Sequence, residues 1–229
     1  MMKTTICCLL YGDYPKLAER CLTPISKLYS TGVQVRIGCN DISKATESVI
    51  SSLFSISDNL TVIKATPQMY KYPMMRALFN INPIDTDYAM WFDDDSYIKS
   101  NNPIKWLEHV ESSMVTNSAD MLGSIYCIPT SIRQKEWRRL HCSWFKDHLY
   151  TNKTTFATGG WWTIKSKILS KYDWPHPLLK HRGGDVLLGD LIKHESLKLV
   201  KFNDGVAINA DENGKESASK RRGFDESPV

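Results

Sequence analysis

The first hundred residues alternate between two patterns of apolar and polar positions. Short runs rich in apolar and β-branched residues predict buried strands, and stretches with apolar residues every three to four positions predict helices. The predicted strands are residues 4–11, 33–38, 60–65 and 88–92, and the predicted helices are residues 15–29, 43–54 and 74–79. Strands that alternate with helices are typical of a mostly parallel sheet covered on both faces, so we expect an α/β fold.

The pattern after residue 100 is less regular. It predicts helices over residues 106–114 and 185–197 and strand-like runs over residues 121–126 and 199–209. Residues 131–150 are basic and aromatic, and in a helix they would present one aromatic and one basic face. The chain is polar and charged from residue 211 onward. We therefore expect a single domain over residues 1–210, divided near residue 100, and a polar basic tail or lid over residues 211–229.

Composition narrows the class of protein. Of the 229 residues, 42 % are hydrophobic and 24 % are charged, which excludes a disordered chain, a collagen-like fibre and a coiled coil. No apolar run approaches the roughly 18–20 residues that span a bilayer, and the run over residues 6–10 is too short for a signal peptide. We therefore expect a cytoplasmic protein without membrane contact. The cysteines form no C-x-x-C pair, which argues against a zinc ribbon or a thioredoxin-type site.

Three consecutive acids, Asp93, Asp94 and Asp95, directly follow the predicted strand 88–92. In parallel sheets, ligands bind at the carboxyl ends of the strands. Adjacent buried carboxylates repel one another, and a hard divalent cation such as Mg²⁺ or Mn²⁺ relieves that cost through oxygen ligands. In extended backbone Asp93 and Asp95 would face the same side, so we predict that they share one ion and its bound phosphates. The alternative is a solvated turn rich in aspartate.

The acid triplet resembles the metal-binding motif of GT-A-fold glycosyltransferases, and three further segments extend the resemblance in the same order. Tyr11-Gly12-Asp13 is similar to the nucleotide-binding start of that fold. Gly159-Gly160-Trp161-Trp162 resembles the glycine-pair loop beneath the acceptor in Fringe-like and core β-galactosyltransferases. The segment 184–189, with Asp185, resembles their later acidic motif. The resemblance spans roughly residues 4–210 and implies a GT-A fold.

The resemblance also implies roles for these residues. The donor would be a nucleotide sugar, most commonly a UDP-sugar. It would bind to the first half of the chain (residues 1–100). Tyr11, Asp13 and Asp94 would contact its nucleotide or sugar. Asp93 and Asp95 would hold Mn²⁺ or Mg²⁺ at the diphosphate. Asp185 would be the general base of an inverting transfer, although a helix N-cap is an alternative role for it.

The third metal ligand departs from the family pattern. Many members use a late histidine, but this chain has no histidine after His194. Asn209 or Asp211 could substitute for it.

Further cations are candidates for contact with the donor. Arg76 could meet the nucleotide or pair with the acid triplet, or it could be a charge on a helix surface. The run Lys220, Arg221 and Arg222 could fold over the diphosphate as a lid, or it could be a solvated tail.

The second half (residues 101–210) would then receive the acceptor. We expect contacts from Trp137, Arg138 and Trp144 and from the loop Gly159, Gly160, Trp161 and Trp162. Cations beside aromatic rings suit a nucleic acid, and the net charge of +4 permits one. The alternative is a helix that packs its tryptophans on the core.

A second resemblance concerns the acceptor. The compact length, KYPMMR, WFDDDSYI, HRGGD and the RRGF tail are similar to small glycosyltransferases of tailed bacteriophages. Some of these are thought to modify hydroxymethylated DNA bases in the cytoplasm of an infected host. This implies double-stranded DNA with a 5-hydroxymethylated pyrimidine as acceptor. The alternatives are a glycan, lipid-linked sugar or protein of the cell envelope, and an inactive module that binds a nucleotide sugar or a nucleic acid. A nucleotidyltransferase is less consistent with the sequence, because no glycine-rich loop with a lysine follows the first strand.

Overall fold

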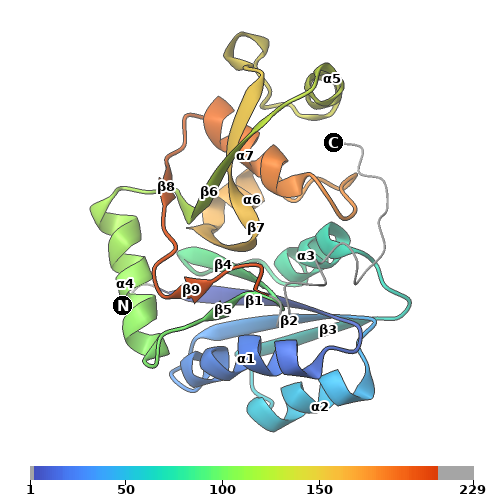
Figure 1. Cartoon of the computed structure of the whole chain (residues 1–229), viewed down its shortest axis with the longest axis vertical. Coiled ribbons are helices and arrows are strands. Elements are labelled where there is room, and N and C mark those ends of the chain that lie inside the picture. The colour runs from blue at the N-terminus through green and yellow to red at the C-terminus, as the bar shows by residue number, and fades with distance from the viewer. Residues whose placement is uncertain (1–2, 211–229) are drawn as a thin grey trace.

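The computed structural model describes residues 3–210 and contains a seven-stranded sheet in the order β3-β2-β1-β4-β7-β6-β8, with a separate β5-β9 pair (Figure 1). The strands are β1 (Thr4–Tyr11), β2 (Gln34–Asn40), β3 (Leu60–Ala65), β4 (Tyr88–Asp93), β5 (Tyr97–Ile98), β6 (Met121–Pro129), β7 (Lys153–Lys165), β8 (Leu199–Lys201) and β9 (Val206–Ala207). The helices are α1 (Pro15–Tyr29), α2 (Lys44–Leu53), α3 (Lys71–Asn80), α4 (Pro103–Thr116), α5 (Ile132–His141), α6 (Ser166–Lys171) and α7 (Gly184–His194), with a short 3₁₀ helix at Asp147–Leu149.

The sheet is parallel through the first half of the chain. β1 lies between β2 and β4 and runs parallel to both, and β3 extends the parallel part beyond β2. β7 then runs antiparallel to β4 and to β6. The carboxyl ends of the four parallel strands therefore meet at one edge, where the acid triplet lies at the end of β4. The predicted α/β class is confirmed.

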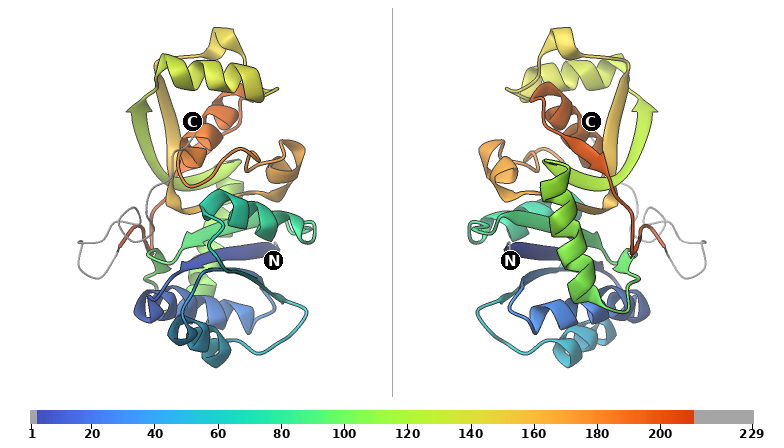
Figure 2. Two further views of the ribbon diagram at one scale, coloured as in Figure 1. Left: turned by 90° about the vertical axis from the view of Figure 1, so that its right-hand side faces the viewer. Right: turned by 90° about the vertical axis from the view of Figure 1, so that its left-hand side faces the viewer.

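Alternate residues of β1 enter two hydrophobic cores, which explains the unbroken apolar run. Ile6, Cys8 and Leu10 pack with α1 and α4 on one face, whereas Cys7 and Leu9 pack with α3 and α7 on the other. The two side views show α3 and α4 on opposite sides of the sheet (Figure 2). A strand covered on both faces needs apolar residues at every position, not at every second one.

The ends of β6 and β7 extend beyond the sheet, and α5 lies on this extension (Figures 1 and 2). The basic, aromatic segment 131–150 is helical only in its first half. α5 begins with a capping box between Ser131 and Gln134 and ends at His141, because Cys142 adopts an extended conformation. The strand expected over residues 199–209 is also broken into β8 and β9, with a turn at Gly205, whose φ of 66° favours glycine.

The helix predicted over residues 15–29 is confirmed at both ends. Pro15 starts α1, and the residues predicted to face the core, among them Leu17 and Cys21, are buried. Two short elements, β5 and α6, were not predicted. Within residues 3–210, no helix combines the length and the hydrophobicity needed to cross a bilayer.

Candidate active site

The acid triplet is buried at the carboxyl end of β4. Asp93, Asp94 and Asp95 are 6 %, 1 % and 4 % exposed. The strand ends at Asp93, and the backbone turns there, because the Ser96 amide donates to the Asp93 carbonyl at 2.9 Å. The prediction that Asp93 and Asp95 face the same side of an extended strand is therefore wrong, because Asp95 lies beyond the end of β4. Asp94 points back toward β1, where its Oδ2 accepts from the Tyr11 amide at 3.3 Å.

Lys71, which the sequence analysis missed, pairs with the first of these acids. Its Nζ donates to Asp93 Oδ2 at 2.6 Å and to the Gly159 carbonyl at 2.9 Å. The indole nitrogen of Trp91 donates to Asp93 Oδ1 at 3.0 Å. Both carboxylate oxygens of Asp93 therefore already accept a hydrogen bond from the protein. The sequence did contain a signal for this pair. Lys71 starts the last helix before the strand that carries the triplet, and three adjacent acids need a cation nearby.

Asp185 lies in the first turn of α7, beside the same lysine. Gly183, with φ of 82°, is the N-cap residue, so the alternative role of Asp185 as N-cap is not observed. Its amide donates to the Tyr72 hydroxyl at 3.1 Å, and the ring of Tyr72 fills the space that a Cβ on Gly184 would need. Burial raises the pKa of Asp185, the charge of Lys71 opposes this, and the charge of Asp93 adds to it. A carboxylate with a raised pKa is a better proton acceptor than an exposed one.

The glycine pair explains how these groups come together. A Cβ on Gly159 would lie 3.0 Å from Lys71 Nζ and 3.5 Å from Asp185 Oδ2. A Cβ on Gly160 would collide with Asn209 Oδ1 and lie 2.7 Å from Ser96 Oγ. The pair thus gives side chains close access to the backbone from two sides.

Asn209 lies beside the acid triplet, as its predicted role requires. Its amide donates to Ser96 Oγ at 3.1 Å, and its Nδ2 donates to Thr158 Oγ1 at 3.2 Å. The amide of the next residue, Ala210, donates to the Asp95 carbonyl at 2.7 Å. The segment after β9 is therefore fixed to the turn that carries Asp95.

The oxygen donors around the acid triplet suit a divalent cation that is only partly enclosed by protein. Among the described residues 3–210, no group of three or more His, Cys, Asp or Glu side chains is placed to hold a metal ion. Mg²⁺ is usually bound through one or two carboxylates, with substrate phosphates and water completing its shell. The carboxylate of Asp95 and the amide oxygen of Asn209 are hard oxygen donors of that kind. The residues present fit a cation shared with a diphosphate, not one enclosed by protein alone.

Tyr11 and Asp13 lie at the carboxyl end of β1 and just after it. Tyr11 is buried and packs edge-on against the ring of His181, with centroids 6.3 Å apart. Asp13 is exposed, and its Oδ1 accepts from Ser43 Oγ at 2.5 Å. Both positions border the edge where ligands bind in such sheets.

Arg76 lies away from the acid triplet. Its Nη1 forms an ion pair with Asp173 Oδ1 at 2.8 Å and donates to the Pro175 carbonyl at 2.9 Å. Arg76 therefore ties α3 to the loop before α7, which corrects the prediction that it meets the triplet. The other predicted donor cations, Arg221 and Arg222, lie outside the described residues.

Trp161 and Trp162 are core residues, and this corrects their predicted contact with an acceptor. They are 0 % and 1 % exposed, because they lie on a central strand covered on both faces. Trp161 packs against Trp106 with centroids 5.9 Å apart, and Trp162 stacks on Trp91 with centroids 6.2 Å apart.

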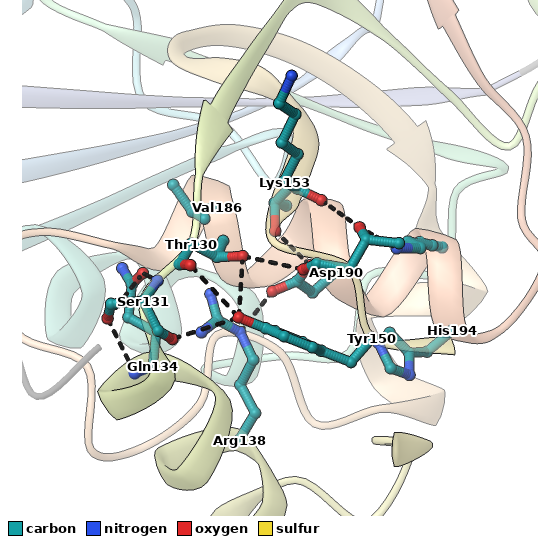
Figure 3. Close-up of polar contacts among 12 residues, drawn as sticks. Thr130, Ser131, Gln134, Arg138, Tyr150, Lys153, Val186, Asp190 and His194 are labelled. Atoms are coloured by element: carbon teal, nitrogen blue, oxygen red, sulfur yellow. Dashed lines mark hydrogen bonds and ion pairs between the residues drawn. The ribbon is translucent and has the colours of Figure 1, made fainter. Parts of the chain in front are cut away.

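Arg138 is also buried, so the prediction that it contacts the acceptor is corrected as well. It is 0 % exposed and forms an ion pair with Asp190 of α7, whose other oxygen accepts from Thr154 at 2.6 Å (Figure 3). The remaining aromatics of this segment are partly buried. Trp137 contacts His141 and His176, and Trp144 contacts His194. α5 thus packs Trp137 and Arg138 against the molecule and leaves Arg133 and Arg139 exposed, which is close to the alternative of a helix that packs its tryptophans on the core.

No protein-family model and no curated protein sequence matches this chain. Several solved structures share its fold. TarS 1–349 of S. aureus is 13 % identical, with 89 % of this chain and 58 % of that chain covered at a TM-score of 0.54. The mannosyltransferase PcManGT of Pyrobaculum calidifontis, solved with GDP-Man and Mn²⁺, is 11 % identical, with 89 % and 55 % covered at a TM-score of 0.56.

GalNAc-T7, solved with UDP, GalNAc and Mn²⁺, is 10 % identical, with 88 % of this chain and 42 % of that chain covered at a TM-score of 0.58. The chain therefore spans between two fifths and three fifths of the length of these three proteins. At such low identity the likeness concerns the fold, and the predicted GT-A architecture is confirmed at that level.

Proposed function

We propose that this protein is a glycosyltransferase that moves a sugar from a nucleotide-sugar donor to an acceptor hydroxyl. One observation carries the proposal: a buried acid triplet at the carboxyl end of β4 lies across the glycine pair from a partly buried carboxylate, Asp185. The likeness in fold to proteins solved with UDP, UDP-GlcNAc or GDP-Man supports it.

The donor binds at the carboxyl edge of the parallel strands. Tyr11 and Asp13 contact the nucleotide, and Asp94 contacts its ribose or the sugar. Asp95 and Asn209 hold Mg²⁺ or Mn²⁺ together with the diphosphate. The predicted direct contact from Asp93 is revised, because Lys71 and Trp91 already donate to both of its oxygens. The bound ion would supply charge neutralisation at the leaving diphosphate.

The transfer inverts the anomeric carbon. The acceptor oxygen attacks that carbon from the side opposite the diphosphate, so the new carbon–oxygen bond forms as the bond to the phosphate oxygen breaks. Asp185 takes the proton of the acceptor hydroxyl. Its burial supports this role, since a carboxylate out of water holds a proton more readily.

The acceptor we propose is double-stranded DNA that carries a 5-hydroxymethylated pyrimidine. The support is the resemblance to phage enzymes and the exposed cations Arg133 and Arg139 on α5. The burial of Arg138 removes one of the predicted phosphate contacts. A glycan, a lipid-linked sugar, a protein acceptor and an inactive binding module are the competing outcomes of the test.

The test measures nucleotide release from a panel of UDP- and GDP-sugars with Mn²⁺ or Mg²⁺, with and without DNA that contains 5-hydroxymethylcytosine. Metal-dependent release stimulated by the modified DNA is the expected result. Release indifferent to DNA would redirect the acceptor to glycans, lipids or proteins. Nucleotide binding without release would indicate an inactive module, and neither binding nor release would refute the proposal.

Two variants separate the roles of the acids. Asp185→Asn should lower kcat by about 100-fold or more while the Kd for UDP changes by less than about threefold. Asp95→Asn should weaken metal-dependent UDP binding itself by about tenfold or more. Asp58→Asn is the control, because Asp58 is an exposed acid just before β3, at the amino-terminal end of that strand and away from the carboxyl edge. Normal turnover in Asp185→Asn would remove Asp185 from the mechanism.

A further inference from the structure

Lys71 connects the two halves of the molecule. It is the first residue of α3, in the donor half, and its side chain reaches Gly159 of β7, in the acceptor half. The start of α3 is fixed on the same side by its neighbour, because the Tyr72 amide donates to the Lys180 carbonyl at 2.9 Å. Tyr72 also accepts from the Asp185 amide. Two consecutive residues of one helix therefore contact both the acid triplet and the loop of the candidate base.

Lys71 contacts β7 where the pairing of that strand is irregular. β7 pairs with β4 through residues 161–165, and with β6 through residues 153–157 and 162–164. Within the described chain, residues 158–160 have no partner residue in either ladder. The Gly159 carbonyl instead accepts from Lys71 at 2.9 Å. A side-chain ammonium group thus contacts the backbone at the point where the strand meets the site.

The ammonium group lies among three functional groups. It is 2.6 Å from Asp93 Oδ2, it contacts the Gly159 carbonyl, and it borders the same Gly159 Cα position as the carboxylate of Asp185. The side chains of Lys71 and Asp93 are only 9 % and 8 % exposed. A lysine in so little water is retained only where it is paired, and here it is paired with the residue that starts the acid triplet.

We propose that Lys71 is a positioning residue that fixes the acid triplet and Asp185 at one distance from each other by holding Asp93 and the 158–160 segment together. This inference rests on the proposed function and extends it. The transfer requires that the base and the donor lie at the correct distance from each other, and a misplacement of about 1 Å can lower the rate about 100-fold. Lys71 acts on the reaction through Asp93 and Gly159.

The test replaces Lys71 with methionine, which keeps the length of the side chain and removes the ammonium group. Lys71→Met leaves the Asp93 carboxylate buried without its cation, so the substitution is also made in the Asp93→Asn background, where no such charge remains. Lys165→Met is the matched control, because Lys165 is a partly buried lysine of β7 that pairs with Asp120 at 2.8 Å, at the end of the strand away from the acid triplet.

Three quantities are measured: kcat and KM for the donor preferred in the release assay, the Kd for UDP with Mn²⁺, and amide hydrogen exchange. Lys71→Met and the double variant Lys71→Met/Asp93→Asn should each lower kcat at least tenfold relative to the parent protein, with KM and the UDP Kd within about threefold. Exchange should become faster in peptides that cover residues 157–161 and 183–187. Lys165→Met should change neither kcat nor exchange in these peptides.

The inference is overturned if the double variant, which has no unpaired buried charge, keeps kcat within tenfold of the parent protein, or if its UDP affinity falls as much as its kcat. A loss that only follows global unfolding would lower the melting temperature and leave the kcat of the folded fraction unchanged, which also overturns it. If the parent protein releases no nucleotide from any donor, the proposed function fails. The exchange measurement then decides separately whether Lys71 holds residues 158–160, and unchanged exchange overturns that contact.

Discussion

Replacing Arg138 with methionine tests whether the basic segment of α5 belongs to the core or to an acceptor surface. Arg138 is 0 % exposed, and its partner Asp190 has a side chain that is only 8 % exposed. Methionine keeps much of the apolar stem and removes the guanidinium group. Asp190 would then be left as a buried carboxylate with the hydroxyl of Thr154 as its recorded hydrogen-bond partner.

The expected cost follows from this burial. Removing one partner of a buried ion pair typically destabilises a protein by about 3–5 kcal/mol, and the hydrogen bond from Thr154 places Arg138→Met near the lower end. A loss of about 3 kcal/mol is a large share of the roughly 5–15 kcal/mol by which domains are stable. In a domain of this size it corresponds to a fall in Tm of about 6–12 °C. The deficit should shrink at low pH, because protonation of Asp190 removes its buried charge.

Urea and thermal unfolding of Arg138→Met, Asp190→Asn and the double variant measure the pair. The double variant should be more stable than the sum of the two single losses predicts, since it leaves no unpaired charge. Arg139→Met is the control, because Arg139 forms an exposed pair with Glu136, and such pairs contribute at most about 1 kcal/mol. If Arg138→Met unfolds like the parent protein but loses stimulation by DNA, Arg138 contacts the acceptor and the burial argument is refuted.

Two further predictions concern the glycine pair and a buried histidine. Gly160→Ala should lower the free energy of unfolding by about 1–3 kcal/mol and weaken UDP binding with Mn²⁺, because its Cβ displaces Asn209 and Ser96; unchanged binding in calorimetry would contradict this. His194 Nδ1 accepts from the Lys146 amide at 2.8 Å, and burial lowers the pKa of His194 to about 4. Between pH 6.5 and 4 the unfolded chain therefore binds a proton that the folded protein does not, so stability should fall as the pH falls through this range. His194→Asn should remove that part of the slope in urea titrations at pH 7 and 4.5, and an unchanged slope would assign it to other groups.

The parallel half of the fold was predictable because its inner strands β1, β2 and β4 are covered on both faces. Its apolar runs end where the strands end, and the boundaries of β1 and α1 follow directly from them. The acid triplet was found for the same reason, since carboxylates after a buried run are rare without a partner. A turn at the triplet was the alternative that the sequence left open, but its burial was not predictable, because the segment after β9, more than a hundred residues later, is hydrogen-bonded to it.

The buried cations were missed because sequence periodicity carries no information on long-range partners. Lys71 contacts residues 22 and 88 positions away, and Arg138 contacts Asp190 of another helix. In a local pattern, both read as charges on a helix surface. The tryptophans were misplaced for another reason: residues 159–162 resemble a glycine-pair loop beneath the acceptor, whereas β7 continues through them as a central strand.

The glycine pair nevertheless marks the site, for a reason visible only in the register of β7. Residues 158–160 lie between the stretches that pair with β4 and with β6, so their backbone groups are available to side chains. Lys71, Asn209 and Asp185 all approach this gap, each from a different element. Since one short piece of strand sets the positions of all three, substitutions at these residues should not be additive: once the strand has shifted, a second change at the same gap removes little that is still in place.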